Sequence, residues 1–318
     1  MIRKIFFLFL IFSCSSSHES DTDLINNNGN TDPQDYDEIE YGVNEYQVTF
    51  QGLERDFIVY IPESYDHQNP SPILFVFHGF GGSNDFIMSY SGFNIISEQE
   101  NFIVVYPKGS DFWGVPHWNV GGWTINSTTD DVSFVNFLID LISYEYNTDQ
   151  NRLYATGMSN GGFFSFLLAC QMSDKFAAIA SVTGSMTPET FFNCDPQKEV
   201  PILQIHGTED PLVTYDGGIN TGNFLNQDWS LGIEEVLDYW VQTNYCSPNP
   251  TSVLLNDSNP NDNFWVERIT FEDGYRGSVV DHYKVYGGEH NWFNNQDINS
   301  SELIWEFFSN HDINGYID

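Results

Sequence analysis

Positive charge is scarce in this chain of 318 residues. It has 10 Lys and Arg against 45 Asp and Glu, which gives a formal net charge of -35 at pH 7. Phosphate backbones and anionic headgroups repel such a surface, so nucleic acid and anionic membranes are excluded as partners. The charge instead indicates a highly solvated surface suited to salty water, where ions screen the self-repulsion. A cationic partner is the alternative interpretation.

The sequence also lacks long apolar runs, internal repeats and clustered metal ligands. No apolar run is long enough to span a bilayer, so no transmembrane helix is expected. No repeat indicates a solenoid, and the length suits one large α/β domain with extensions. The four Cys residues are not spaced with His as in a zinc site, and we expect no metal.

The first 14 residues have the pattern of an export signal. Arg3 and Lys4 form a short basic region, and residues 5–12 are apolar but too few to cross a membrane. Ser13-Cys14 at the end of this run resembles a bacterial lipoprotein signal, with Cys14 as the lipidated residue. A plain secretion signal cleaved nearby is the alternative. Both predict export, either as an outer-membrane or cell-surface lipoprotein held only by its lipid anchor, or as a secreted or periplasmic protein.

Residues 15–44 are rich in Ser, Asp, Asn and Glu and predict a disordered tether, whereas residues 45–318 predict one folded domain. Export permits one disulfide among Cys170, Cys194 and Cys246. Cys170 lies on the apolar face of a predicted helix, so we expect it in the core. Cys194–Cys246 is one hypothesis for the pair, and the sequence leaves the pairing of the three cysteines open.

Alternating strand and helix patterns predict a doubly wound α/β fold. Two β-rich runs flank Gln51-Gly52 and predict an antiparallel hairpin, and the later, continuous apolar runs are typical of strands buried on both faces. Strands are expected at 46–50, 57–61, 73–77, 102–106, 152–156, 177–182, 202–205, 265–271 and 279–285. Helices are expected over part of 86–100 and at 131–146, 163–172, 232–244 and 301–310, with a Trp-rich loop at 108–129 and an Asn/Gly-rich excursion at 215–230. Asp130 or Asp131 caps the second helix. The prediction is a mostly parallel sheet that begins with the antiparallel hairpin.

The segment Gly157-Met158-Ser159-Asn160-Gly161-Gly162 stands between a predicted strand and a predicted helix. A serine on such a sharp turn is typical of the nucleophile elbow of α/β-hydrolases. The glycines permit a strained backbone packed closely against strand and helix. The turn projects the serine oxygen above the sheet and directs the first amides of the helix at a reacting carbonyl.

A serine hydroxyl needs a histidine base, and that histidine needs a carboxylate to fix its tautomer. In this fold the acid follows a strand after the elbow and the histidine follows the last strand. Asp210 and His290 stand at these two places. The weaker candidates are Glu209, Glu289, Asp281 with His282, His311, and His117 in the Trp-rich loop, where a substrate contact is conceivable.

Two backbone amides are expected to form an oxyanion hole. One belongs to Asn160, which follows the nucleophile. The other belongs to Phe80, in the turn after the strand at 73–77. His78 and His206 each end a strand before a glycine, and we interpret both as structural residues that hold turns by side-chain hydrogen bonds.

Six motifs occur in one order along the chain. They are His78-Gly79-Phe80-Gly81-Gly82, Trp118-Asn119-Val120-Gly121-Gly122, Asp130-Asp131-Val132, Gly157-Met158-Ser159-Asn160-Gly161-Gly162, His206-Gly207-Thr208-Glu209-Asp210-Pro211 and Gly288-Glu289-His290-Asn291-Trp292. Together they resemble the polyhydroxybutyrate depolymerase and feruloyl esterase group of secreted α/β-hydrolases, from about residue 46 to the end. The resemblance implies Ser159, Asp210 and His290 as the triad, Phe80 and Asn160 as oxyanion amides, and no cofactor.

The resemblance thus predicts a serine carboxylic ester hydrolase that works through an acyl-enzyme. Feruloyl or acetyl esters of polysaccharide are the expected substrates, because aromatic faces stack on sugars and phenolic acyl groups. Trp118, Trp123 and Trp292 are candidate substrate contacts, although the loop tryptophans have the alternative role of packing the loop onto the domain. A polyhydroxybutyrate depolymerase is the first alternative function. A serine peptidase and a non-catalytic surface binding protein are the others. The sequence departs from the family pattern at Trp123, Glu289 and Asn291. These departures bear on which ester is preferred more than on the reaction itself.

Overall fold

The computed structural model describes residues 4–5, 39–124, 126–222, 225–295 and 297–317. Apart from Lys4 and Ile5, the residues of the predicted export signal, including Cys14, lie outside these ranges, as does most of the predicted tether. Strand β2 (Gly42–Phe50) begins inside the stretch expected as tether, so the folded domain starts slightly earlier than the sequence indicates. Within the described ranges, no helix combines the length and apolarity needed to cross a bilayer.

In the described part of the chain, one large sheet has the strand order β1-β2-β3-β5-β4-β8-β9-β10-β15-β14-β13. After β2, its strands are β1 (Lys4–Ile5), β3 (Leu53–Ile61), β4 (Ser71–Phe77), β5 (Ile103–Pro107), β8 (Thr148–Met158), β9 (Ala178–Val182), β10 (Ile202–Gly207), β13 (Thr251–Leu254), β14 (Trp265–Phe271) and β15 (Val280–Tyr286). The central strands from β5 to β15 run parallel. Antiparallel pairs flank them, β2 and β3 on one side and β13 and β14 on the other.

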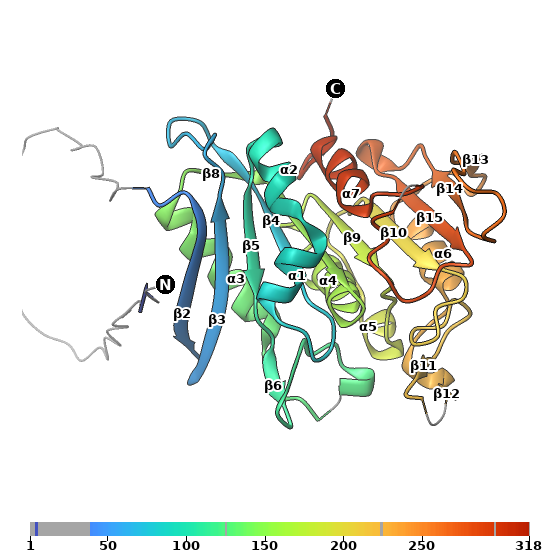
Figure 1. Cartoon of the computed structure of the whole chain (residues 1–318), viewed down its shortest axis with the longest axis horizontal. Coiled ribbons are helices and arrows are strands. Elements are labelled where there is room, and N and C mark those ends of the chain that lie inside the picture. Colours follow the sequence, from blue (N-terminus) through green and yellow to red (C-terminus); the bar gives the residue numbers. More distant parts are fainter. Residues whose placement is uncertain (1–3, 6–38, 125, 223–224, 296, 318) are drawn as a thin grey trace, which may run out of the picture.

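Helices cover both faces of the sheet (Figure 1). One apolar cluster packs under α1 (Asn84–Ser91), α2 (Phe93–Glu100) and α7 (Ser300–Ser309). The other packs under α3 (Asp131–Glu145), α4 (Asn160–Gln171) and α6 (Ile233–Thr243). Strands β4, β5, β9 and β10 are buried along their whole length, which explains their continuous apolar runs. The predicted doubly wound, mostly parallel sheet is therefore confirmed.

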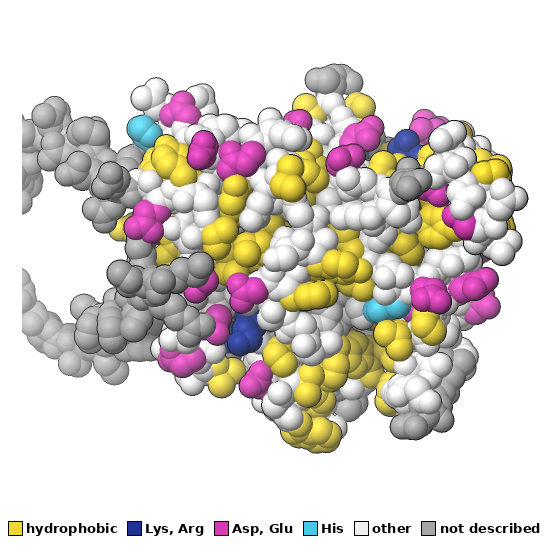
Figure 2. Space-filling model, viewed as in Figure 1, with side chains coloured by type: hydrophobic (Ala, Val, Ile, Leu, Met, Phe, Trp, Pro, Cys, Tyr) yellow, Lys and Arg dark blue, Asp and Glu magenta, His cyan; other side chains and the backbone are white. Residues whose placement is uncertain are grey.

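Acidic side chains are scattered over the face seen in Figure 2, and basic ones are few there. One of the basic side chains is buried instead of exposed. Arg55 on β3 contacts Asp131 at 2.8 Å, and both side chains are almost fully buried. The same carboxylate accepts a hydrogen bond from Asn119 N at 2.8 Å, while its neighbour Asp130 caps α3 through Ser133 N. Asp130 therefore caps the helix, and Asp131 anchors the loop that contains Asn119.

Several short elements escaped the sequence patterns. Where a helix was expected over part of 86–100, the structure has two helices, because Gly92 adopts a φ of 70° between α1 and α2. The Trp-rich loop contains a hairpin and a 3-10 turn, and the later excursion contains a small ribbon. The additional elements are β6 (Ser110–Phe112), β7 (Val115–His117), η1 (Gly122–Thr124), α5 (Pro188–Phe192), β11 (Ile219–Asn220), β12 (Leu225–Asn226), η2 (Gln227–Trp229), η3 (Tyr275–Gly277), β16 (His311–Asp312) and β17 (Gly315–Tyr316).

The predicted disulfide is wrong. Cys170 at the end of α4 pairs with Cys194, with their Cα atoms 4.8 Å apart, and Cys246 is a buried free thiol. The segment after α5 folds back onto α4 and brings Cys194 to the helix. Cys170 does lie in the apolar core, as expected, but it is cross-linked there.

Candidate active site

The elbow segment forms the predicted sharp turn between β8 and α4. Ser159 has φ 55° and ψ -119°, a conformation that a non-glycine residue adopts at a cost of about 1–3 kcal/mol. Its amide donates to Val182 O at 2.8 Å, which ties the strained residue to the end of β9. The turn therefore holds the serine at the carboxyl edge of the sheet.

The elbow glycines provide space. A Cβ on Gly161 would lie 2.2 Å from Phe77 O, and a Cβ on Gly157 would lie 2.5 Å from Gly161 C. Larger residues here would push α4 away from β4 and β8. The close approach of backbone to backbone, and not a positive φ, is why these two positions need glycine.

Asp210 and His290 come together from two different strand ends. His290 Nδ1 lies 2.7 Å from Asp210 Oδ2. The other carboxylate oxygen of Asp210 accepts from the amides of Leu212 and Val213, at 2.8 and 2.9 Å. The Asp210 side chain is fully buried and the His290 side chain is largely buried. This arrangement fixes the imidazole with Nδ1 protonated and leaves Nε2 as a potential base.

Ser159 and His290 line the same pocket of about 540 Å³. Within the described residues, Ser159 Oγ makes no hydrogen bond to His290. Such contacts are often long in a ligand-free site and shorten when substrate binds. Assigning the three residues as a catalytic triad remains a prediction.

The two expected oxyanion amides face the same region. A Cβ on Gly79 would lie 3.4 Å from Ser159 Cβ, so the turn before Phe80 abuts the serine. Among the described residues, the N–H groups of Phe80 and Asn160 have no hydrogen-bond acceptor. Two unpaired donors beside a serine suit an oxyanion.

His78 and His206 hold turns, as their positions predicted. His78 Nε2 accepts from Gly109 N at 2.9 Å, so Nδ1 donates to Gly79 O at 2.7 Å. Burial lowers the pKa of His78 to about 4, which keeps the ring neutral. Burial also lowers the pKa of His206, whose Nε2 lies 2.9 Å from Val213 O. The two rings thus fix the turns that carry Phe80 and Asp210.

Trp118 does not contact the pocket, which corrects the prediction that it binds substrate. Its side chain is 0% exposed, and its Nε1 donates to His78 O at 3.0 Å. The Asn160 side chain bonds to both the amide and the carbonyl of Trp118, at 2.7 and 3.0 Å. Trp118 therefore braces the elbow against the Phe80 turn. No sequence pattern indicates this additional role of the Asn160 side chain.

Trp292 is also no substrate contact. It is 1% exposed and its Nε1 donates to Ser301 Oγ at 2.8 Å, within the α7 face of the core. Trp123 does line the Ser159 pocket, where its ring packs edge-on against Phe80 at 5.6 Å and Phe163 at 6.0 Å. Of the three candidate tryptophans, only Trp123 stays a candidate.

The alternative catalytic residues lie elsewhere. Glu209 and Glu289 are exposed to solvent. His117 is buried, with Nδ1 2.8 Å from Ser110 O and Nε2 2.8 Å from Ser127 Oγ, so it stabilises its own loop instead of contacting substrate. His282 and His311 are buried in the core.

Most of the pocket wall was missed by sequence patterns. It is largely apolar and comes from α1, the β6–β7 hairpin and the 215–230 excursion. The unpredicted lining residues include Phe86, Ile87, Phe112, Leu212, Ile219 and Trp229. The sequence signal that could have indicated this wall is Trp229, a large aromatic residue in the Asn- and Gly-rich stretch 215–230.

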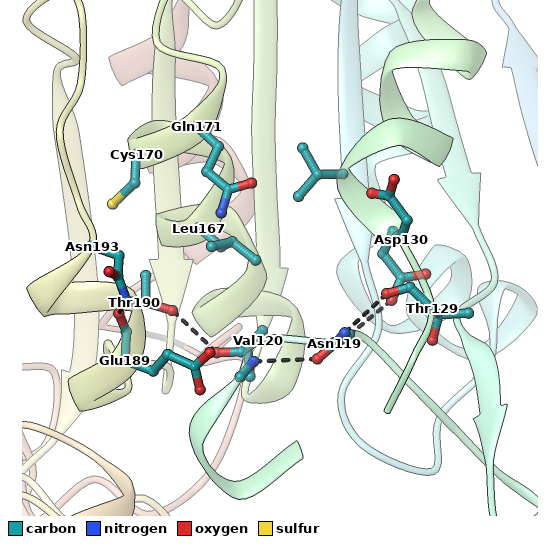
Figure 3. Close-up of a pocket in the computed structure, with 13 residues that line it drawn as sticks. Asn119, Val120, Thr129, Asp130, Leu167, Cys170, Gln171, Glu189, Thr190 and Asn193 are labelled. Carbon is teal, nitrogen blue, oxygen red and sulfur yellow. Dashed lines mark hydrogen bonds between the residues drawn. The ribbon is translucent and has the colours of Figure 1, made fainter. Parts of the chain in front are cut away.

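A second pocket, of about 340 Å³, lies between α3, α4 and α5 and contains neither Ser159 nor His290 (Figure 3). At its floor, Val120 O accepts from the hydroxyls of Thr187 and Thr190, at 3.0 and 3.1 Å. Glu189 accepts from Gly122 N at 2.8 Å. These bonds hold η1, and with it Trp123, against α5. The second pocket thus lies next to the hydrogen bonds that hold Trp123 in the wall of the Ser159 pocket.

The family comparison extends over most of the domain. A family model described as putative esterase matches residues 50–294. The chain belongs to this esterase family. A bifunctional acetylxylan esterase/xylanase of Neocallimastix patriciarum is 30% identical over 86% of this chain and 36% of its own length. A probable feruloyl esterase C of Aspergillus niger is 27% identical over 80% of this chain and 83% of its own length. The chain thus spans about a third of the length of the first relative and most of the length of the second.

Two solved structures have the same fold as this chain. An acetyl xylan esterase from Aspergillus awamori superposes with a TM-score of 0.60 at 16% identity, over 84% of this chain and 99% of that one. A thermostable esterase superposes with a TM-score of 0.56 at 15% identity, over 85% of this chain and 63% of that one. At such identities the likeness concerns the fold alone, and it confirms the predicted α/β-hydrolase architecture.

Proposed function

We propose that the protein is a serine carboxylic ester hydrolase that works through an acyl-enzyme. The observation that carries the proposal is the 2.7 Å contact between His290 Nδ1 and the buried Asp210, in a ring that lines one pocket with the strained Ser159. Membership in the esterase family supports the same reaction class.

In the proposed reaction, His290 Nε2 takes the proton from Ser159 Oγ while that oxygen attacks the ester carbonyl. The carbonyl oxygen becomes an oxyanion and accepts hydrogen bonds from the amides of Phe80 and Asn160. Asp210 stabilises the imidazolium that forms. His290 then protonates the departing alcohol as its bond to the acyl carbon breaks. In the second half of the reaction, His290 takes a proton from a water that attacks the acyl carbon. The bond from that carbon to Ser159 Oγ then breaks, His290 returns the proton to Oγ, and the acid leaves.

The pocket favours an aromatic acyl group. Phe80, Phe112, Trp123, Phe163 and Trp229 surround a space of about 540 Å³, whereas an acetyl group would fill only a small part of it. Relatives named as feruloyl and acetylxylan esterases support polysaccharide-linked esters. The proposed substrates are therefore feruloyl esters of polysaccharide first and acetyl esters second.

The proposed enzyme acts outside the cytoplasm. The Cys170–Cys194 disulfide supports an oxidising compartment, in line with the export signal expected at residues 1–14. Attachment through a lipidated Cys14 remains part of the proposal.

Hydrolysis by the purified chain tests the proposal. Methyl ferulate, an acetylated xylo-oligosaccharide and a 3-hydroxybutyrate oligomer are offered side by side, with Ser159→Ala as the matched variant. We expect hydrolysis of the first two, fastest for methyl ferulate, and a loss of several orders of magnitude in the variant. A preference for the 3-hydroxybutyrate oligomer would instead indicate a polyester depolymerase. Activity retained by the variant would contradict the proposal.

A further inference from the structure

A second exposed feature adjoins the Ser159 pocket at the tip of the β6–β7 hairpin. We call Phe112, Trp113 and the polar pocket beside them the Trp113 platform. The side chain of Trp113 is 86% exposed. Hydrophobic side chains gather at the lower edge of the molecule in Figure 2, where Figure 1 places the β6 end of this hairpin. An indole this exposed contributes almost nothing to the core.

The backbone under Trp113 is strained. Phe112 pairs with Val115, so Trp113 and Gly114 alone form the turn, and their φ values are 52° and 81°. A two-residue turn with two positive φ values favours Asn-Gly, and a bulky residue at its first position is an outlier. The turn is thus strained at Trp113, although the exposed indole adds little packing that could offset the strain. An outlier of this kind indicates a role in binding.

Among the described residues, Trp113 has one aromatic neighbour, Phe112, and this neighbour connects it to the Ser159 pocket. The ring of Phe112 stacks on the indole, with centroids 5.0 Å apart and planes inclined by 9°. Phe112 lines the Ser159 pocket and also the polar pocket, which has a volume of about 480 Å³. A molecule that reacts at Ser159 can therefore extend past Phe112 onto the platform.

The polar pocket offers groups that suit sugar hydroxyls. Asp111, Asn126 and Thr128 line it and are exposed, and their side chains make no hydrogen bond to another described residue. Lys108 also lines the pocket, on the side of β3. A flat aromatic face beside a carboxylate, an amide and a hydroxyl matches a sugar ring, which has an apolar face and a polar rim.

We propose that the Trp113 platform is a saccharide subsite that binds the sugar residues on the alcohol side of the ester. The inference rests on the proposed function, since it places the acyl group in the Ser159 pocket and the sugar beyond Phe112. It adds the recognition of the polysaccharide itself, separately from the acyl group. The subsite contacts the ring next to the scissile bond and takes no part in the chemistry.

The test uses Trp113→Asn, which restores the ordinary Asn-Gly turn and removes the indole. Trp113→Phe keeps a ring, and Phe192→Asn removes another aromatic side chain of high exposure, 80%, outside both pockets. The readout is the ratio of kcat/KM for a feruloylated xylo-oligosaccharide to kcat/KM for methyl ferulate. We expect Trp113→Asn to lower this ratio on the order of tenfold through KM, Trp113→Phe to restore most of it, and Phe192→Asn to leave it unchanged.

A binding experiment tests this inference independently of the proposed function. Calorimetry with a xylo-oligosaccharide on the Ser159→Ala chain measures the subsite without turnover, and adding Trp113→Asn should weaken binding by a similar factor. If the wild type hydrolysed neither ester, the proposed function would fail, and the binding experiment would still decide on the subsite. Unchanged binding and an unchanged ratio in Trp113→Asn would overturn the inference. So would a dimer that dissociates in Trp113→Asn with saccharide binding intact, since the platform would then be a self-association surface.

Discussion

Replacing Asp210 by asparagine exchanges one carboxylate oxygen for an NH2 group and keeps the shape of the side chain. One carboxylate oxygen accepts from the amides of Leu212 and Val213, at 2.8 and 2.9 Å. An asparagine must keep its carbonyl oxygen on these two donors, so its NH2 group faces His290 Nδ1. The imidazole then has to accept at Nδ1 and to carry its proton on Nε2. In this tautomer Nε2 cannot take the proton of Ser159.

The expected loss in kcat for Asp210→Asn is about 10⁴-fold, the size of effect that a wrong tautomer has in such triads. This corresponds to about 5 kcal/mol of transition-state stabilisation. The assay is kcat on methyl ferulate at pH 7, with Glu209→Gln as the matched control, because Glu209 is the adjacent and exposed carboxylate. The control should stay within about twofold of the wild type. Asp210 would not be the residue that orients His290 if Asp210→Asn kept more than about a tenth of kcat, or if the control lost as much.

Three further predictions concern the pocket and the fold. Trp123→Ala removes part of the acyl wall and should lower kcat/KM for methyl ferulate about tenfold relative to an acetyl ester, whereas an equal effect on both would argue against this role. Burial lowers the pKa of His78 to about 4 from about 6.5 in the unfolded chain, so its contribution to stability is full above pH 6.5 and falls by up to about 3 kcal/mol as the pH drops toward 4. In urea titrations across this range, His78→Gln should flatten the decline, and an unchanged slope would be inconsistent with the assignment. Replacing Cys170 and Cys194 by serine removes a cross-link between residues 24 apart and should lower the free energy of unfolding by about 3 kcal/mol, while a dithiol reductant should destabilise only the wild type.

Sequence patterns predicted what depends on local chemistry. Buried parallel strands must be apolar on both faces, so β4, β5, β9 and β10 stand out as continuous runs. The crowding between Gly161 and Phe77 O permits no side chain, so the elbow is visible as a glycine pattern. The positions of Asp210 and His290 could be predicted from the order of the strands, because each residue follows the end of a strand and these ends meet at one edge of the sheet.

The remaining features depend on how segments fold back in space. Cys194 reaches Cys170 only because α5 returns to α4, and spacing along the chain does not reveal this. Trp118 and Trp292 belong to two of the six motifs, yet both side chains are buried in the core. The pocket wall comes from α1 and from the 215–230 excursion, whose residues share no motif.

If His290 activates Ser159 as a nucleophile, an organophosphonate ester should react with Ser159, and mass spectrometry of the intact chain detects the product. We expect one covalent adduct, located at Ser159 by peptide mapping. It should be absent in Ser159→Ala and form far more slowly in His290→Ala and Asp210→Asn. An unlabelled wild type with a native fold, or an adduct that persists in Ser159→Ala, would contradict this role of Ser159.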